Sequence, residues 1–154
     1  MMTLCCDVIQ TLRGKTLATA ESLTGGGIGA ALTSVSGASA VYKGGIISYT
    51  NEIKHKLLGV PMEILKEYGA VSAPTAKVMA EGARKALEAD VAVSVTGLAG
   101  PTGDEFGNPV GTVFIGYSDE NGTLVKPCLF SGDRESIRNQ TIAEALQLIL
   151  DMQK

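Results

Sequence analysis

The spacing of hydrophobic residues changes between helical and strand-like several times in the first third of the chain. Leu4, Val8 and Leu12 fall on one helical face and predict a helix over residues 3–13. The pattern then predicts a strand over 15–21, a small-residue helix over 28–34 and a second strand-like run over 40–49. A glycine-rich segment separates the first strand from its helix, which is typical of a strand–loop–helix unit.

The rest of the chain continues this alternation and then changes to paired strands. The pattern predicts helices over 51–58, 61–68 and 72–88, a buried strand over 91–96, strands over 112–118 and 123–130, and a last helix over 133–152. A long loop over 97–111, with five glycines and two prolines, follows the buried strand. Asn121-Gly122 supplies the positive φ values of a tight hairpin, so we expect the last two strands to be antiparallel.

This order of elements predicts the fold class. Alternating strands and helices followed by a hairpin and a covering helix indicate an α/β protein, a three-layer α/β/α sandwich with a mixed, mostly parallel sheet. We expect one domain over residues 1–154. Ligands of such sheets bind beyond the carboxyl ends of the strands. The two glycine-rich loops, 22–27 and 97–103, are therefore expected to face one crevice.

Composition narrows the possible functions. The chain has 154 residues, of which 45% are hydrophobic and 19% charged, which excludes a largely disordered chain. Its formal net charge is −3 without any basic block, so we expect no binding of nucleic acid and none of anionic membranes. No apolar stretch is long enough to span a bilayer and the N-terminus lacks the features of a signal peptide, so we expect a cytoplasmic protein.

Few residues of the chain can bind a metal. There are three cysteines, two of them adjacent at Cys5 and Cys6, and a single histidine, His55, which we expect on a helix surface. Neither a multi-histidine metal site nor a histidine-dependent triad is supported, and we expect no cofactor. The expected partner is a small molecule, together with a second copy of the chain in a homo-oligomer formed through the first or the last helix.

Two segments could carry chemistry. The loop Ser22 to Gly27 precedes a helix, so its amides suit a phosphate, a carboxylate or a developing oxyanion, although a plain turn would look the same. The loop matches neither a Walker sequence nor a dinucleotide fingerprint. Lys54 lies near a helix N-terminus, where the dipole disfavours a cation. It is either an ordinary exposed lysine or a proton acceptor of lowered basicity.

Six ordered motifs then resemble one known family. They are Ala20 to Gly26, Ser48 to Lys54 with Leu57 to Val60, Gly69 to Ser72, Thr96 to Pro101, Pro109 to Val113, and Phe130 to Arg134. Together they are similar to the CinA C-terminal domain, and the resemblance extends from Thr16 onward. It implies a nicotinamide-nucleotide amidohydrolase (NMN deamidase), which converts nicotinamide mononucleotide and water to nicotinate mononucleotide and ammonia without a metal.

The resemblance also implies roles for particular residues. Ser22 would attack the carboxamide carbon, while Lys54 and Tyr49 would take its proton and pass one to the departing ammonia. Ser48 is an alternative nucleophile. Either Thr24 to Gly26 or Gly97 to Gly100 would stabilise the oxyanion. The expected substrate-binding residues are Thr24, Gly25, Gly26, Asn51, Thr96, Gly97, Gly100 and Arg134, with Arg138 as a further candidate for the phosphate.

The sequence departs from the family pattern in the long loop. Asp104 stands where relatives often have glycine, and Asn108 where they often have lysine before Pro-Val-Gly. The chain also lacks the larger N-terminal domain of two-domain CinA proteins, so we expect the stand-alone form without that domain's pyrophosphatase activity. Two other functions stay open: a nucleotide-binding module without catalysis, acting as a sensor or binding a partner, and a structural subunit whose glycines only shape turns.

Overall fold

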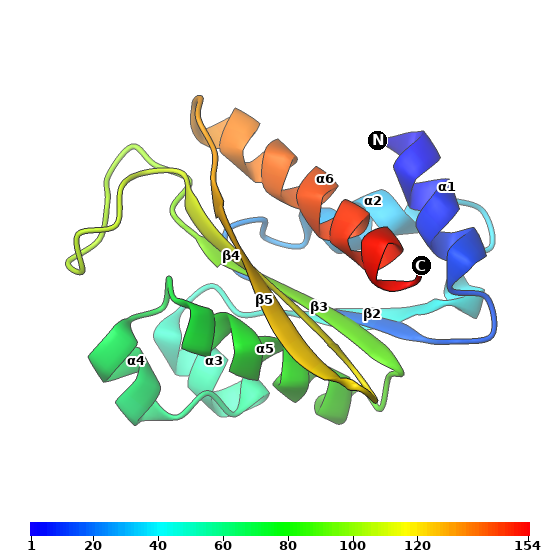
Figure 1. Ribbon diagram of the computed structural model, residues 1–154, viewed down its shortest axis with the longest axis horizontal. Coiled ribbons are helices and arrows are strands. Elements are labelled where there is room, and N and C mark those ends of the chain that lie inside the picture. Colours follow the sequence, from blue (N-terminus) through cyan, green and yellow to red (C-terminus); the bar gives the residue numbers. More distant parts are fainter.

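A five-stranded sheet forms the middle layer of the computed structural model, which describes residues 1–154 (Figure 1). The strands are β1 (Leu17–Glu21), β2 (Tyr42–Ile47), β3 (Val91–Gly97), β4 (Thr112–Asp119) and β5 (Gly122–Leu129), in the order β2-β1-β3-β4-β5. The pairs β2–β1 and β1–β3 are parallel, and the pairs β3–β4 and β4–β5 are antiparallel. Only β4 therefore runs against the other four strands, which confirms the predicted mixed sheet.

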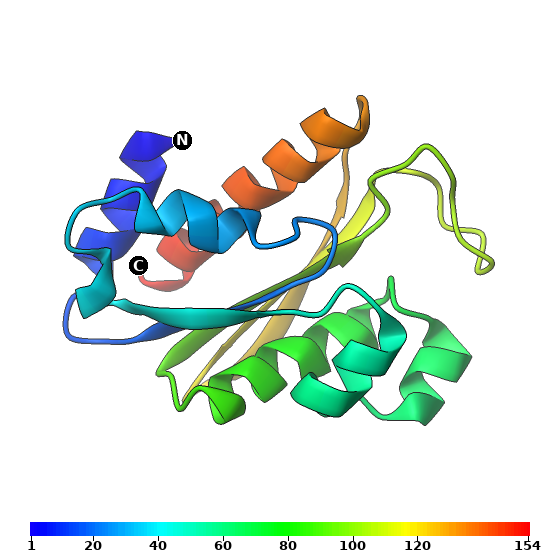
Figure 2. The same cartoon turned by 180° about the vertical axis from the view of Figure 1, so that it is seen from behind.

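Six helices cover the two faces of the sheet. On one face lie α1 (Met2–Thr11), α2 (Gly27–Thr33) and α6 (Arg134–Met152), and on the other α3 (Asn51–Leu58), α4 (Met62–Tyr68) and α5 (Ala73–Ala86). The view from behind shows the same three layers (Figure 2). The predicted α/β/α sandwich is confirmed. None of the helices combines the length and the apolar character that a membrane-spanning segment needs.

The two faces of the sheet bury different kinds of side chain. Large aliphatic residues such as Leu17 and Ile115 fill the layer beneath α1, α2 and α6, which holds the larger hydrophobic cluster. Small residues such as Ala18 and Ala20 face the other layer. Residue 82 of α5 is glycine, and a Cβ there would overlap the carbonyl of Leu58 at the end of α3. The small residues therefore let α3 pack closely against α5 and the sheet.

Several elements are shorter than the hydrophobic pattern predicts. The first strand begins at Leu17 and not at residue 15, because the Thr16 amide and hydroxyl both donate to Asp90. The second begins at Tyr42, since residues 38–40 form a 3-10 turn (η1, Ala38–Ala40). Helix α5 ends at Ala86, because Glu88 has a φ of 50°.

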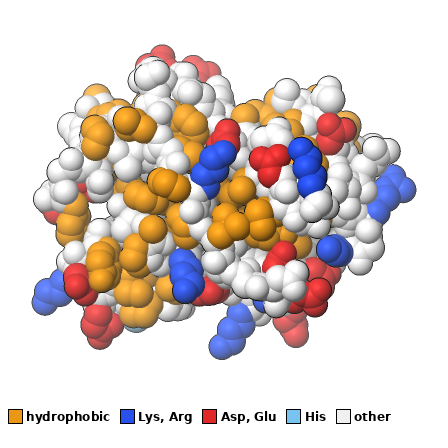
Figure 3. All heavy atoms as spheres, viewed as in Figure 1, with side chains coloured by type: hydrophobic (Ala, Val, Ile, Leu, Met, Phe, Trp, Pro, Cys, Tyr) orange, Lys and Arg blue, Asp and Glu red, His pale blue; other side chains and the backbone are white.

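Strand β5 forms one open edge of the sheet. Figure 3 shows hydrophobic side chains on the face of the molecule where β5 lies nearest the viewer, and Leu124 and Leu129 on this strand are exposed. Pro127 lies within β5 opposite Phe114. Phe130 N–H donates to the carbonyl of Gly111, and the alternation of an antiparallel ladder then places the nitrogen of Pro127 on the outer side. The outer edge therefore lacks one donor.

Candidate functional site

A pocket of about 300 Å³ opens beyond the carboxyl ends of β1, β2 and β3. Its lining residues are Ser22, Leu23, Tyr49, Lys54, Ala70, Val71, Thr96, Gly97, Leu98, Ala99, Gly100, Thr102, Gly103 and Arg134. Residues from both glycine-rich loops line it, as the sequence predicts. Lys54 and Arg134 are the only charged residues in this lining. The pocket is therefore cationic although the chain is acidic overall.

Ser22 follows β1 directly and is held at the floor of the pocket. Its N–H donates to the carbonyl of Val95 at 3.1 Å, and its carbonyl accepts from the N–H of Gly25 at 3.1 Å. The first bond continues the β1–β3 ladder by one residue, and the second turns the chain sharply toward α2. The side chain is 7% exposed. A hydroxyl is thereby presented at the sharp turn between a strand and a helix.

Lys54 brings a buried amine to this hydroxyl. The Nζ atom lies 2.8 Å from Ser22 Oγ, 2.7 Å from the Ser48 carbonyl and 3.4 Å from the Tyr49 carbonyl. The side chain is 1% exposed and forms no salt bridge. Burial lowers the pKa of Lys54 from 10.5 to about 8, because desolvation penalises the charged ammonium. Of the two interpretations that the sequence left open, the geometry supports the amine of lowered basicity.

The start of α3 explains how Lys54 is positioned. Thr50 caps the helix by accepting the Ile53 N–H, and the Lys54 N–H donates to the Thr50 carbonyl. Lys54 thus lies one turn into α3. Because α3 packs closely against α5, the aliphatic part of the side chain is buried and its amine reaches Ser22.

Ser48 does not share this arrangement. Its side chain is fully buried, its hydroxyl donates to the Glu21 carbonyl at 3.5 Å, and it does not line the pocket. The structure therefore places the hydroxyl of Ser22, and only the backbone carbonyl of Ser48, beside Lys54.

Tyr49 lies at the pocket mouth with its side chain 59% exposed. Its hydroxyl accepts a hydrogen bond from Arg134 at 3.0 Å and forms none with Ser22 or Lys54. Only its backbone carbonyl reaches the Lys54 amine. The predicted part of the Tyr49 hydroxyl in proton transfer is thus not reflected in the geometry, because the side chain points outward to Arg134.

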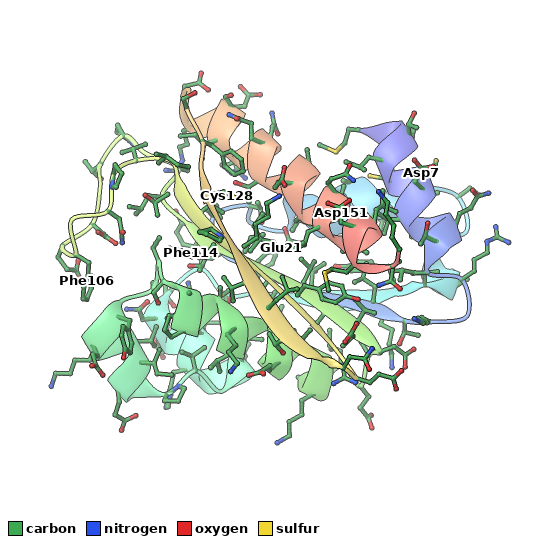
Figure 4. All side chains as sticks on the ribbon, in the orientation of Figure 1. Asp7, Glu21, Phe106, Phe114, Cys128 and Asp151 are labelled. Carbon is green, nitrogen blue, oxygen red and sulfur yellow. The ribbon has the colours of Figure 1, made fainter.

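The N-terminus of α2 already holds a carboxylate, that of Glu21. This side chain is 2% exposed and accepts hydrogen bonds from the amides of Ile28 and Gly29 at 2.8 and 3.0 Å, and from the Thr24 hydroxyl at 2.6 Å. Figure 4 shows Glu21 inside the molecule, between the sheet and the helices that cover it. The loop therefore does bind a carboxyl group, but this group is the protein's own Glu21.

Three predicted substrate-binding residues in this loop do not line the pocket. Thr24 is buried and its hydroxyl is committed to Glu21, while Gly25 and Gly26 lie outside the pocket lining. The loop turns at Ser22 and Leu23, so that Gly25 faces Arg138 of α6 and Gly26 faces Ile47 of β2. Arg138 on α6 donates to the carbonyls of Leu23 and Thr24 at 2.9 and 3.1 Å. It braces the loop and does not line the pocket.

The other predicted binding residues are divided. Gly97, Gly100 and Arg134 line the pocket, whereas Asn51 lines a neighbouring groove beside α4. Arg134 donates to the Gly100 carbonyl at 2.6 Å and, as described, to the Tyr49 hydroxyl. Thr96 lines the pocket, but its hydroxyl donates to the Ala70 carbonyl at 2.7 Å. Thr96 therefore supports the pocket wall.

Several pocket amides have no partner within the chain. The N–H groups of Leu23, Ala99 and Gly100 make no hydrogen bond. The amide that follows a nucleophilic serine at a strand–helix turn is a common oxyanion donor, and Leu23 holds that position.

Sequence reasoning missed Ala70 and Val71 as pocket residues, although both belong to one of the six motifs. No cluster of three or more His, Cys, Asp or Glu side chains is arranged to hold a metal ion.

Comparison with known proteins gives one consistent family. A family model described as the CinA C-terminal domain matches residues 3–153. A putative competence-damage inducible protein of Thermoanaerobacter sp. (strain X514) and a CinA-like protein of Geobacter sulfurreducens are each 48% identical to this chain over 134 residues. Both matches cover 87% of this chain and 32% of the relative. The chain thus spans about a third of the length of these curated relatives.

Solved structures agree closely with this fold. The competence/damage inducible protein CihA from Agrobacterium tumefaciens has a TM-score of 0.95 and 39% identity, covering 99% of this chain and 95% of its own. A competence-damaged protein (CinA) superfamily protein from Escherichia coli has a TM-score of 0.96 and 33% identity, covering 98% and 89%.

Proposed function

The chain belongs to the CinA C-terminal domain family, and on that premise we propose that it is a nicotinamide-nucleotide amidohydrolase. It would hydrolyse the carboxamide of nicotinamide mononucleotide to nicotinate mononucleotide and ammonia, without a metal. The observation that carries the proposal is the 2.8 Å contact between Ser22 Oγ and the buried Nζ of Lys54. A serine beside a desolvated amine is an activated nucleophile with its base in place.

The hydrogen-bond capacity of Lys54 supports a role as base. A neutral amine has two N–H donors and one lone pair. The carbonyls of Ser48 and Tyr49 can accept the two N–H groups, which leaves the lone pair for the hydroxyl proton of Ser22. No carboxylate stabilises the charged form. The surroundings of Lys54 therefore suit proton acceptance near neutral pH.

The reaction then proceeds in two halves. Ser22 Oγ attacks the carboxamide carbon as its proton moves to Lys54, and the oxyanion accepts hydrogen bonds from pocket amides such as that of Leu23. Lys54 returns the proton to the leaving ammonia, and an acyl-enzyme forms on Ser22. Water then attacks the acyl carbon as its proton moves to Lys54. The bond between this carbon and Ser22 Oγ breaks, Lys54 returns the proton to Ser22 Oγ, and nicotinate mononucleotide leaves.

Arg134 is placed to bind the phosphate of an anionic substrate. Its guanidinium lies at the pocket mouth and contacts only the Gly100 carbonyl and the Tyr49 hydroxyl, both neutral. An arginine without a carboxylate partner can bind a phosphate through two parallel hydrogen bonds. A pocket of about 300 Å³ lies at the small end of ligand sites and suits a mononucleotide better than a dinucleotide.

Ammonia release tests the proposal directly. Chelator-treated protein is incubated with nicotinamide mononucleotide beside the Ser22→Ala, Lys54→Ala and Ser48→Ala variants. We expect metal-independent release that is lost in the first two variants and retained in the third. A folded wild type that binds the nucleotide, seen as a higher melting temperature, without releasing ammonia would instead indicate a binding module.

A further inference from the structure

The connector between α4 and α5, residues 69–72, is held in an unusual way. Side chains donate hydrogen bonds to all of its first three carbonyls. Thr75 Oγ1 and Ser72 Oγ donate to the carbonyl of Gly69 at 2.7 and 3.0 Å. Thr96 Oγ1 donates to the carbonyl of Ala70 at 2.7 Å, and Asn108 Nδ2 donates to the carbonyl of Val71 at 3.3 Å.

The long loop strengthens this hold. Phe106 packs over Gly69, where a Cβ would lie 2.6 Å from the ring. Figure 4 shows Phe106 at the outer end of this loop, beside α4. Asp104 accepts hydrogen bonds from the Asn108 amide and side chain, so it fixes the side chain that binds Val71. The two departures from the family pattern thus act together on the connector.

Two amides of the connector lack the hydrogen-bond partners that its carbonyls have. The N–H groups of Ala70 and Val71 make no hydrogen bond within the chain, although both residues line the pocket and Val71 is only 7% exposed. Buried N–H groups without partners are rare. In a planar trans peptide the N–H points opposite to the carbonyl, so fixing the Ala70 carbonyl on Thr96 also fixes the direction of the Val71 N–H.

The connector lies close to the nucleophile. Glu21 of β1 pairs with Val95 of β3, so Ser22 and Thr96 are the next neighbours along these strands. Adjacent strands lie about 4.8 Å apart, and residues at alternate positions share one face. Thr96 therefore stands beside Ser22 and holds the 70–71 peptide at the edge of the reacting centre.

We propose that the Ala70 and Val71 amides bind the oxygen of the group that Ser22 attacks, and that Thr96 is the positioning residue that aims the Val71 amide. This inference rests on the proposed function. The ligand class is a carbonyl or phosphoryl oxygen that gains negative charge in the transition state. Together with the Leu23 amide, the connector then forms an oxyanion site whose two sides come from different elements.

Thr96→Val tests the role of Thr96, because valine keeps the shape and removes the hydroxyl. Thr96→Ser restores the hydroxyl. Ser94→Ala is the matched control, because Ser94 lies on the same face of β3 and donates to the Ala76 carbonyl at 2.6 Å, outside the pocket lining. Thermal unfolding followed by circular dichroism establishes that each variant is folded.

The first readout is independent of the nucleotide. A fluorophosphonate reacts with activated serines: the Ser22 Oγ–P bond forms, the P–F bond breaks, fluoride leaves, and the hydroxyl proton passes to Lys54. We expect Thr96→Val to slow this labelling about 10-fold to 100-fold, since a misaimed oxyanion donor costs part of its full effect. Thr96→Ser and Ser94→Ala should react at close to the wild-type rate.

The second readout is ammonia release from nicotinamide mononucleotide, in which Thr96→Val should lower kcat and leave KM within about twofold. Three outcomes would overturn the inference. Thr96→Val could be labelled at the wild-type rate, Ser94→Ala could be slowed as much as Thr96→Val, or the wild type could fail to be labelled. If Thr96→Val does not fold, Thr75→Val replaces it, because it frees the Gly69 carbonyl and with it the direction of the Ala70 N–H, and it should also slow labelling. Labelling of a wild type that releases no ammonia would refute the proposed function alone, and the Thr96 comparison would still decide the inference.

Discussion

Glu21 and Lys54 are both ionisable, both almost completely buried, and lie on opposite sides of the end of β1. Glu21 faces α2 and accepts three hydrogen bonds of 3.0 Å or less, two of them from a helix N-terminus that favours negative charge. Lys54 lies on α3, and its amine is hydrogen-bonded only to a hydroxyl and two carbonyls. Neither residue forms a salt bridge, but Glu21 accepts hydrogen bonds from groups that favour a carboxylate, whereas Lys54 lies beside neutral groups only.

This difference indicates a structural role for Glu21 and a chemical role for Lys54 in the proposed function. A buried carboxyl group that accepts several short hydrogen bonds fixes the elements around it. A buried amine without a counter-ion loses its proton readily, and this property makes it useful as a base. Glu21 therefore holds the loop that carries Ser22, while Lys54 lies beside the Ser22 hydroxyl, where the proposed function needs a base.

The largest effect is expected for Lys54→Met, which removes the amine and keeps the length of the side chain. Turnover should fall about 10³-fold or more, because the base is lost. The free energy of unfolding should not fall, because replacing a buried, uncompensated cation by an apolar group removes a desolvation cost. Ammonia release and urea denaturation measure the two quantities. A variant that unfolds more easily would assign Lys54 the structural role that we give to Glu21.

A somewhat smaller effect is expected on the pH dependence of stability. Between pH 8 and 10.5 the unfolded chain still binds a proton at Lys54 that the folded chain has released. Stability therefore rises with pH in this window, by about 3 kcal/mol relative to Lys54→Met for a shift of this size. Urea denaturation of both proteins at several pH values gives the difference. In the same way, kcat/KM should rise with pH and level off above about 8. A difference in stability between the two proteins that does not change with pH would mean that Lys54 is not desolvated.

Glu21→Gln should give the next effect, a loss of about 2 kcal/mol in the free energy of unfolding. The amide keeps the shape but replaces one acceptor oxygen by a donor that faces the N–H groups of α2. Urea denaturation at neutral pH measures the loss. Glu52→Gln, an exposed acid in the first turn of α3, is the control and should change stability much less. Equal stability of the two variants would argue against a capping role for Glu21.

The smallest effect is expected for Arg134→Lys, which keeps the charge and removes the planar fork. KM for nicotinamide mononucleotide should rise about tenfold, because lysine cannot form two parallel hydrogen bonds with a phosphate, while kcat should change little. Steady-state ammonia release gives both constants. Nicotinamide riboside, which lacks the phosphate, is the matched substrate and should not distinguish the variant from the wild type. A kcat effect would place Arg134 with Lys54 at the reacting centre.

Much of the fold could be predicted because it depends on local spacing. The three-layer order and the shared crevice follow from hydrophobic periodicity and from the positions of glycines, and both are present. The ends of elements depend on single distant contacts, such as that of Thr16 with Asp90, which no local pattern contains. For this reason the predicted first strand begins two residues too early.

The site could be predicted only in part, for a related reason. Lys54 is conspicuous in the sequence because it stands at the wrong end of a helix, but its burial depends on how α3 packs against α5 at Gly82. The loop after β1 suits an anion, but that the anion is Glu21 depends on the strand alternation that turns this side chain toward α2. The connector 69–72 was missed as a pocket wall because its carbonyl partners come from three separate segments.

Pro127 has a consequence for how the molecule behaves beside its own copies. An unpaired strand edge is a template onto which a strand of a second molecule can add, and repeated addition leads to aggregation. On β5 the template is interrupted, because the proline nitrogen faces outward and has no hydrogen to donate. An incoming strand would lose one ladder bond there and meet the proline ring. The edge thus discourages growth of the sheet from one molecule into the next.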